Sequence, residues 1–315
     1  MYLPILIETL NVTGPIFVLV ILGLVLRRVG FLNDLFVENS TKLVFTICLP
    51  LLLFTTIIRI DLDQTLNLKV FNFSMVACCI TFALSWLVAV ILVSPKEDRG
   101  VFVQACFRSN LGVVGLALCS NAYGEQGLAL ASLLMAGMTV IYNILSVFIL
   151  SFYNVKESAS FKGVIVDIAK NPLIVAIFLA VAVAFFETPV PSIVLSTGEY
   201  LGSMALPLAL LGCGAGMNLK AIRSASKNTF LGVVMKAVLL PFGVTVLAIS
   251  LDFEGLALGV IFLLFVSPTA TASFIMVKSM GGNSALSANL IMTTTLASIL
   301  TSSFGLFWLK LSALA

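Results

Sequence analysis

The chain has 315 residues, a net charge of +3, 60% hydrophobic residues and only 10% charged residues. Soluble domains carry about 25% charged residues, so this composition excludes an ordinary soluble fold. The chain also lacks histidine, and none of its six cysteines forms a CxxC pair, so no metal site, cofactor or enzymatic activity is expected.

Ten apolar segments follow one another along the chain, each long enough to cross about 30 Å of hydrocarbon as a helix. Their predicted spans are residues 4–28, 40–60, 70–94, 100–121, 126–153, 164–186, 191–217, 228–250, 255–275 and 284–311. We therefore predict an all-α polytopic membrane protein with ten transmembrane helices in a lipid bilayer.

Basic residues are distributed unevenly between the two sides of this topology. Loops on one side hold twelve lysines and arginines, loops on the other side hold three, and Arg108 and Lys236 fall inside helices. Basic loops stay in the cytoplasm, so both termini are predicted on the non-cytoplasmic side. Because the basic residues are spread over short loops, no nucleic-acid partner is indicated.

The sequence repeats itself at an offset of 157 residues. Leu49-Pro50-Leu51 recurs as Leu206-Pro207-Leu208, and the same offset superposes further pairs: Pro15 on Pro172, Gly124 on Gly281, and Asp61-Leu62 on Asn218-Leu219. Each copy holds five segments, and an odd number of crossings inverts the second copy. We predict two inverted five-helix repeats, residues 1–153 and 164–315, joined by a cytoplasmic linker at 154–163.

The fourth and ninth segments contain polar, helix-breaking stretches at equivalent places in the two copies. These stretches begin at Arg108 and at Val266, and the repeat offset places Asn110 on Ser267. A helix that begins in mid-membrane presents a positive dipole end, and two such ends favour an anion. The candidate substrate-binding residues are Asn110, Gly112, Gly115, Pro268, Thr269 and Thr271. The alternative is that these small residues only pack helices together.

Five further residues stand out inside the apolar segments. Pro50 and Pro207 are expected to kink their helices beside the same centre. Arg108 either guides an anion at the cytoplasmic vestibule or extends to the membrane surface, whereas Lys236 is expected to extend there. Asn143 is either a polar contact near the crossover or an interhelical hydrogen-bonding group.

An ordered set of short motifs resembles the auxin efflux carrier family over essentially the whole chain. The runs that carry the resemblance are 48–50, 107–116, 123–127, 170–173, 206–208 with 212–216, and 267–270. The short loop between the fifth and sixth segments resembles the bacterial branch, which implies an inner-membrane location. Family members usually carry proline where this chain has Ala117, so the sharpness of the break in the fourth helix stays open.

The resemblance implies a carrier with a scaffold domain (helices 1, 2, 6 and 7) and a transport domain (helices 3–5 and 8–10). It also implies substrate binding where helices 4 and 9 cross, elevator-type motion, and a homodimer. The predicted function is export of a small organic anion, either a dicarboxylate or an auxin-like carboxylate. Two alternatives are a sodium-coupled organic-anion symporter, as in bile-acid transporters of related fold, and a membrane sensor that does not transport.

Overall fold

A computed structural model describes residues 2–59, 68–153, 170–217, 226–312 and 314. The predicted linker at 154–163 and the pair Asp61-Leu62 with Asn218-Leu219 lie outside the described residues. The described chain is helical throughout and contains no strand beyond one isolated bridge. The helices of the first part are α1 (Tyr2–Arg28), α2 (Asp34–Leu43), α3 (Leu49–Ile57), α5 (Leu68–Leu92), α6 (Asp98–Phe107) and α7 (Leu116–Tyr153). Those of the second part are α9 (Pro172–Phe185), α10 (Ser192–Ser203), α11 (Ala205–Ala215), α13 (Lys227–Val234), α14 (Leu240–Ile249), α15 (Gly255–Val266), α16 (Ala272–Ser279) and α17 (Ser284–Leu311).

Seven helical spans in the described part of the chain are long and apolar enough to cross a membrane, and α9 and α15 are shorter apolar helices. Apolar side chains such as Phe178 and Leu300 are exposed on the outside of the helices. An exposed apolar surface of this kind belongs in lipid. The all-helical, polytopic membrane fold is therefore confirmed, whereas ten crossings and an inverted repeat stay predictions.

The helical hydrogen-bond ladder is distorted ahead of three prolines that lie inside apolar spans, whereas α1 continues through Pro15. Wide π-helical turns occupy η1 (Val44–Cys48) before Pro50 and η3 (Met235–Leu239) before Pro241. The ladder between α10 and α11 is interrupted at Met204, three residues before Pro207. Proline has no backbone N–H and its ring crowds the preceding turn, so the chain widens or breaks there.

Two glycines separated by the repeat offset turn the chain between consecutive helices. Gly124 (φ 60°) divides α7 at a non-helical turn, and Gly281 (φ 72°) lies between α16 and α17. Positive φ is accessible to glycine at little cost because it lacks Cβ. The same kind of turn thus occurs at matching places in the two halves of the sequence.

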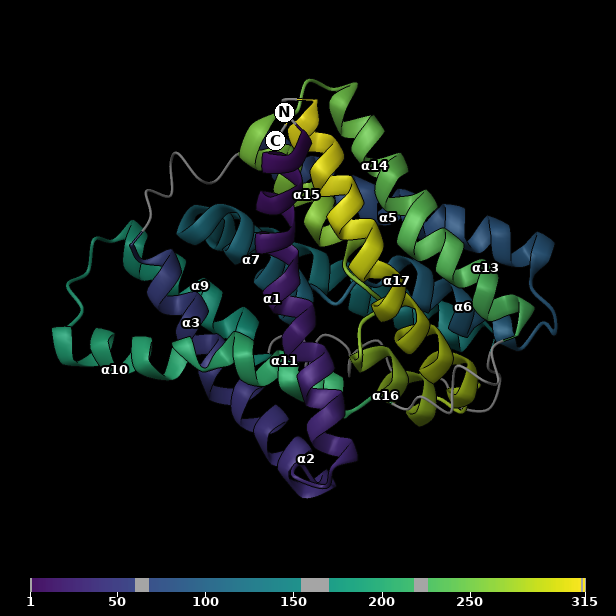
Figure 1. The fold of residues 1–315 in the computed structure, drawn as a ribbon, viewed down its shortest axis with the longest axis horizontal. Coiled ribbons are helices and arrows are strands. Elements are labelled where there is room, and N and C mark those ends of the chain that lie inside the picture. Colours follow the sequence, from purple (N-terminus) through teal and green to yellow (C-terminus); the bar gives the residue numbers. More distant parts are fainter. Residues whose placement is uncertain (1, 60–67, 154–169, 218–225, 313, 315) are drawn as a thin grey trace.

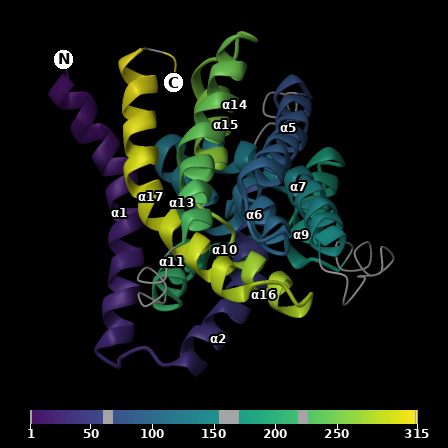
Figure 2. The same cartoon turned by 90° about the vertical axis from the view of Figure 1, so that its right-hand side faces the viewer.

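The helices pack in two groups that meet along α7 (Figure 1). In the first group, α1 packs against α11 and α3 packs between α9 and α10. In the second, α5, α6, α7, α13, α14, α15, α16 and α17 pack on one another, and α1 also contacts α7 and α17. The termini lie together at one end of the molecule (Figures 1 and 2), where Lys310 Nζ lies 2.5 Å from Glu8 Oε1.

Candidate functional site

The interruptions of the fourth and ninth segments meet and pair through their backbones. The first helix halves, α6 and α15, end at Phe107 and Val266. Between the breaks, Asn110 N donates to Pro268 O at 2.7 Å, and Ala270 N donates to Arg108 O at 3.0 Å. This antiparallel bridge satisfies backbone groups that each break removes from its helix, which a membrane interior requires.

Helical structure resumes after each break. The π-helical segment η2 (Leu111–Gly115) leads into α7, and α16 begins at Ala272. Pro268 holds the preceding Ser267 in an extended conformation (φ −54°, ψ 140°). The fourth segment breaks without a proline at Ala117, because residues 108–110 pair with residues 268–270.

Thr269 fastens the bridge to two neighbouring helices. Its Oγ1 donates to Ala105 O on α6 at 2.7 Å, and its backbone N donates to Thr294 Oγ1 on α17 at 3.1 Å. The side chain is fully buried. Thr269 therefore holds the crossover in place, and it is not among the residues that line the cavity beside it.

A cavity of about 420 Å³ opens on one side of this crossover. The breaks supply residues 108–112 and 270–272 to its wall, α7 supplies Met135, Thr139 and Tyr142, and the start of α9 with the residues before it supplies 170–173; Phe45 of η1 completes it. A volume of this size suits a small metabolite. The wall combines both groups of helices, so a bound solute would contact both.

Electrostatics at this cavity favour a negatively charged solute. Arg108 and Lys170 belong to its wall, and no aspartate or glutamate is among the described residues that line it. Helical segments that begin at Leu111, Pro172 and Ala272 turn their positive dipole ends toward the same space. Two fixed cations and three helix starts therefore surround it.

Arg108 and Asn110 are the polar groups best placed to bind such a solute. Arg108 is buried, and Nη1 donates to Ser146 Oγ at 3.2 Å and contacts Met276 Sδ at 3.1 Å. Both partners are uncharged, and a guanidinium has five N–H donors. Asn110 is 6% exposed, and its Nδ2 has no hydrogen-bond partner in the described part of the chain. A buried amide donor without a partner is costly unless a ligand satisfies it.

The predicted cradle residues divide between this wall and the packing behind it. Arg108, Asn110, Gly112 and Thr271 line the cavity, whereas Gly115, Pro268, Thr269 and Asn143 do not. A Cβ added at Gly115 would lie 3.1 Å from Leu264 Cδ2, so this glycine provides space for α15. Gly112 has more room, since its nearest neighbour, Met135 Sδ, is 3.7 Å away.

The position of the Lys236 side chain differs from the one predicted from the sequence. We predicted that its side chain extends to the membrane surface, but it is only 2% exposed. Nζ donates to Ser109 Oγ at 2.5 Å and to Phe265 O at 3.2 Å. The prediction was wrong because acceptors at the crossover itself replace the hydrogen bonds that the ammonium would make with water.

Sequence reasoning also missed Lys170, Asn171 and Tyr142 as parts of the wall. A signal for the first two was present: Asn171 before Pro172 is a helix-start pattern. In the structure Asn171 Oδ1 accepts from Leu173 N at 3.0 Å. The place of Lys170 in the cavity wall becomes clear only from the tertiary structure, which directs the start of α9 toward the crossover.

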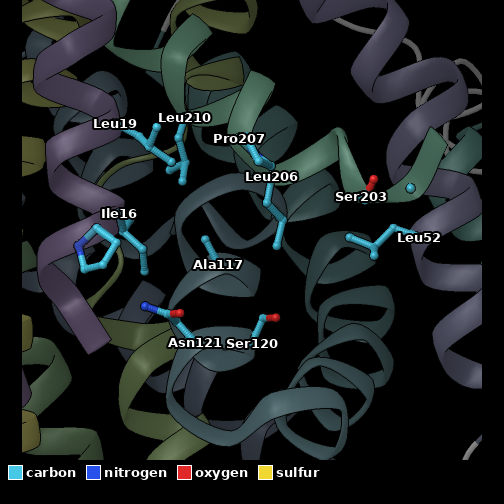
Figure 3. A pocket seen from close by; sticks show the side chains of 12 residues that line it. Ile16, Leu19, Leu52, Ala117, Ser120, Asn121, Ser203, Leu206, Pro207 and Leu210 are labelled. Atoms are coloured by element: carbon cyan, nitrogen blue, oxygen red, sulfur yellow. The ribbon is translucent and has the colours of Figure 1, made fainter. Parts of the chain in front are cut away.

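A second cavity of about 330 Å³ lies between α1, α3, α7, α10 and α11 (Figure 3). Figure 3 shows Leu19, Leu206 and Pro207 along its upper side and Asn121 with Ser120 below. Its wall is mostly apolar and holds no charged residue among those described. Residues 111 and 112 line the crossover cavity, whereas Ala117 and Ser120 line this one, so consecutive turns of one helix reach both cavities.

A family model described as membrane transport protein matches residues 12–306. An uncharacterized transporter of Methanocaldococcus jannaschii is 22% identical over 298 residues, which cover 92% of this chain and 96% of the relative. An uncharacterized transporter of Methanothermobacter thermautotrophicus is 24% identical over 260 residues, covering 81% of this chain and 83% of that relative.

Proposed function

The chain belongs to the membrane transport protein family, and from this premise we propose that it is a secondary carrier that exports a small organic anion through the crossover cavity. The resemblance to the auxin efflux carriers is thereby confirmed, as is the general function of a transporter embedded in the membrane. The solute, the direction and the type of motion are our proposals.

One observation carries the choice of an anion. Asn110, whose buried Nδ2 has no partner among the described residues, lies in a wall that also holds Arg108 and Lys170 but no described carboxylate. A carboxylate of the solute would accept from the amide and from the guanidinium at once. Charge-assisted hydrogen bonds of this kind are stronger than neutral ones, and a dicarboxylate would let Lys170 bind the second group.

The packing supports an elevator-type motion. Arg108 and Asn110 belong to the group formed by α5–α7 and α13–α17, whereas Lys170 precedes α9 of the other group. Displacement of the α5–α7 and α13–α17 group, as the transport domain, against the group of α1, α3 and α9–α11, as the scaffold, would carry the solute from one side to the other. The membrane potential favours export of an anion by about 2.3 kcal/mol per charge at 100 mV.

A thermal-shift screen of small mono- and dicarboxylates against the purified full-length protein tests the proposal. The transported anion is expected to raise the Tm of the wild type and to lose most of this effect in Asn110→Ala. Asn143→Ala is the matched control, because Asn143 lies on α7 outside the cavity wall. The screen is repeated in choline chloride, where a lost shift would indicate the sodium-coupled alternative.

Equal stabilisation of wild type and Asn110→Ala by every anion would remove the crossover cavity as the binding site. A shift lost in Asn143→Ala but kept in Asn110→Ala would move the site deeper along α7. Binding without flux in liposomes would favour the sensor alternative over a carrier.

A further inference from the structure

The ammonium of Lys236 lies at the negative end of α15. Nζ donates to Phe265 O, a carbonyl in the last turn of α15, and to the hydroxyl of Ser109. Carbonyls in the last turn of a helix lack intrahelical partners and carry the negative end of its dipole. Ser109 Oγ also lies 3.5 Å from Phe265 O, so the three groups form one compact cluster.

This cluster provides what a buried ammonium needs in the absence of a carboxylate. The three ion pairs seen among the described residues involve neither Lys236 nor Arg108. Removing an ammonium from water is expensive unless dipoles replace its hydration. Oxygen atoms in such a cluster would equally accept a free monovalent cation or an alkylammonium ion.

The two basic residues of the crossover differ in how they relate to the helix ends. Arg108 follows directly on the last residue of α6, and Lys236 contacts the last turn of α15. The ammonium of Lys236 therefore lies at the negative end of α15, whereas the guanidinium of Arg108 contacts Ser146 Oγ and Met276 Sδ. The positive helix starts at Leu111 and Ala272 face the cavity instead. The crossover can thus present a positive surface without an added cation.

We propose that Lys236 is a positioning residue, a tethered cation that occupies an oxygen site between Ser109 and the end of α15 and fixes the bridge at the crossover. Truncation of the side chain would leave this site open to a free cation of matching size. The proposal concerns the crossover without solute, so it can fail while the anion proposal stands, and the reverse.

Chemical rescue of Lys236→Ala tests this role. The substitution removes three methylene groups and the ammonium, which together match propylammonium in size and charge. We expect a lower Tm for the purified full-length variant, and a saturable recovery of most of that loss when propylammonium chloride is added, as mass action requires for a ligand of the folded state.

Two controls separate a cation site from a general packing defect. Choline at equal ionic strength has the charge but no N–H donors, so it should not restore the Tm. In Lys236→Met the side chain fills the space without charge, so that variant should lose stability and gain nothing from propylammonium. Wild type should show no response to either ion.

Absence of recovery in Lys236→Ala, or equal recovery with choline, would overturn the proposal. So would stabilisation of wild type by propylammonium, because its site would then lie elsewhere. Where Lys236→Ala yields no folded protein, purification in propylammonium chloride replaces the titration. The proposal then requires monodisperse protein with propylammonium and none with choline, and equal yields in both would overturn it.

Discussion

At the scale of single residues, the crossover gives different surroundings to the two basic residues of the apolar segments. Arg108 and Lys236 both fall inside apolar segments, and both are buried. Lys236 uses its donors on Ser109 and a helix-end carbonyl, whereas Arg108 contacts only a hydroxyl and a sulfur and lines the cavity. Arg108 is therefore the cation available to a solute, whereas Lys236 hydrogen-bonds within the protein.

We expect Arg108→Gln to weaken binding of the anion selected by the thermal-shift screen by about 10- to 100-fold, since a buried hydrogen bond to a charged group contributes about 1.5–3 kcal/mol. Lys170→Ala is the comparison, because Lys170 is exposed. Its loss should cost less, about 1 kcal/mol or below. Titration of Tm against anion concentration measures both, and an Arg108→Gln affinity equal to that of wild type would remove the guanidinium from the site.

At the scale of elements, α1 and α11 approach each other through glycines. A Cβ on Gly214 would lie 1.8 Å from Val20 O, and one on Gly23 would lie 2.1 Å from Leu211 O. These neighbours are backbone atoms, which cannot rotate away as a side chain can. Small residues at such contacts let membrane helices pack closely. The close packing therefore joins α1 to α11, the second half of the seventh predicted segment.

Gly214→Ala should lower the Tm and the monodisperse fraction in detergent, because overpacking of this kind costs about 1–3 kcal/mol or more. Gly212→Ala is the matched control, two residues earlier on the same helix. There a Cβ would have Thr41 Oγ1, 3.7 Å away, as its nearest contact. Alanine favours helix over glycine by about 0.8–1 kcal/mol, so Gly212→Ala should leave the Tm unchanged or raise it. Equal effects of the two substitutions would contradict the close α1–α11 contact.

At the scale of the whole molecule, the two cavities lie along the boundary between the helix groups, and α7 reaches both. Beside the second cavity, Asn121 Nδ2 on α7 donates to Val12 O on α1 at 2.5 Å. Thr13 Oγ1 and Ser303 Oγ, 2.8 Å apart, join α1 to α17. These contacts hold the groups together near the second cavity, while the crossover cavity stays open to a solute.

Much of this architecture could be predicted from hydropathy and helix-breaking residues. The first and last helices end at Arg28 and Leu311, as predicted, and both interruptions fall where Ser109-Asn110 and Ser267-Pro268 indicate them. Helix breaks have a local cause, namely proline and polar residues within an apolar run, so the sequence carries them.

The composition of the cavity wall could be predicted only in part. Helical periodicity stops at a break, so it does not say that Asn110 faces the cavity while Thr269 faces Ala105. Lys170 joins the wall because α9 packs against α3 and α7, a tertiary contact with no local signal. The surroundings of Lys236 depend likewise on Phe265, 29 residues away.

Electrical recording from liposomes fused to a solid-supported membrane tests the central claim most directly. A concentration jump of the anion selected by the screen should produce a current of the sign of anion movement through wild type. Because the crossover carries its own cations, the current should persist in choline buffer. Asn110→Ala should abolish the current, and Asn143→Ala should retain it. A current of equal size in wild type and Asn110→Ala would contradict an anion site at the crossover.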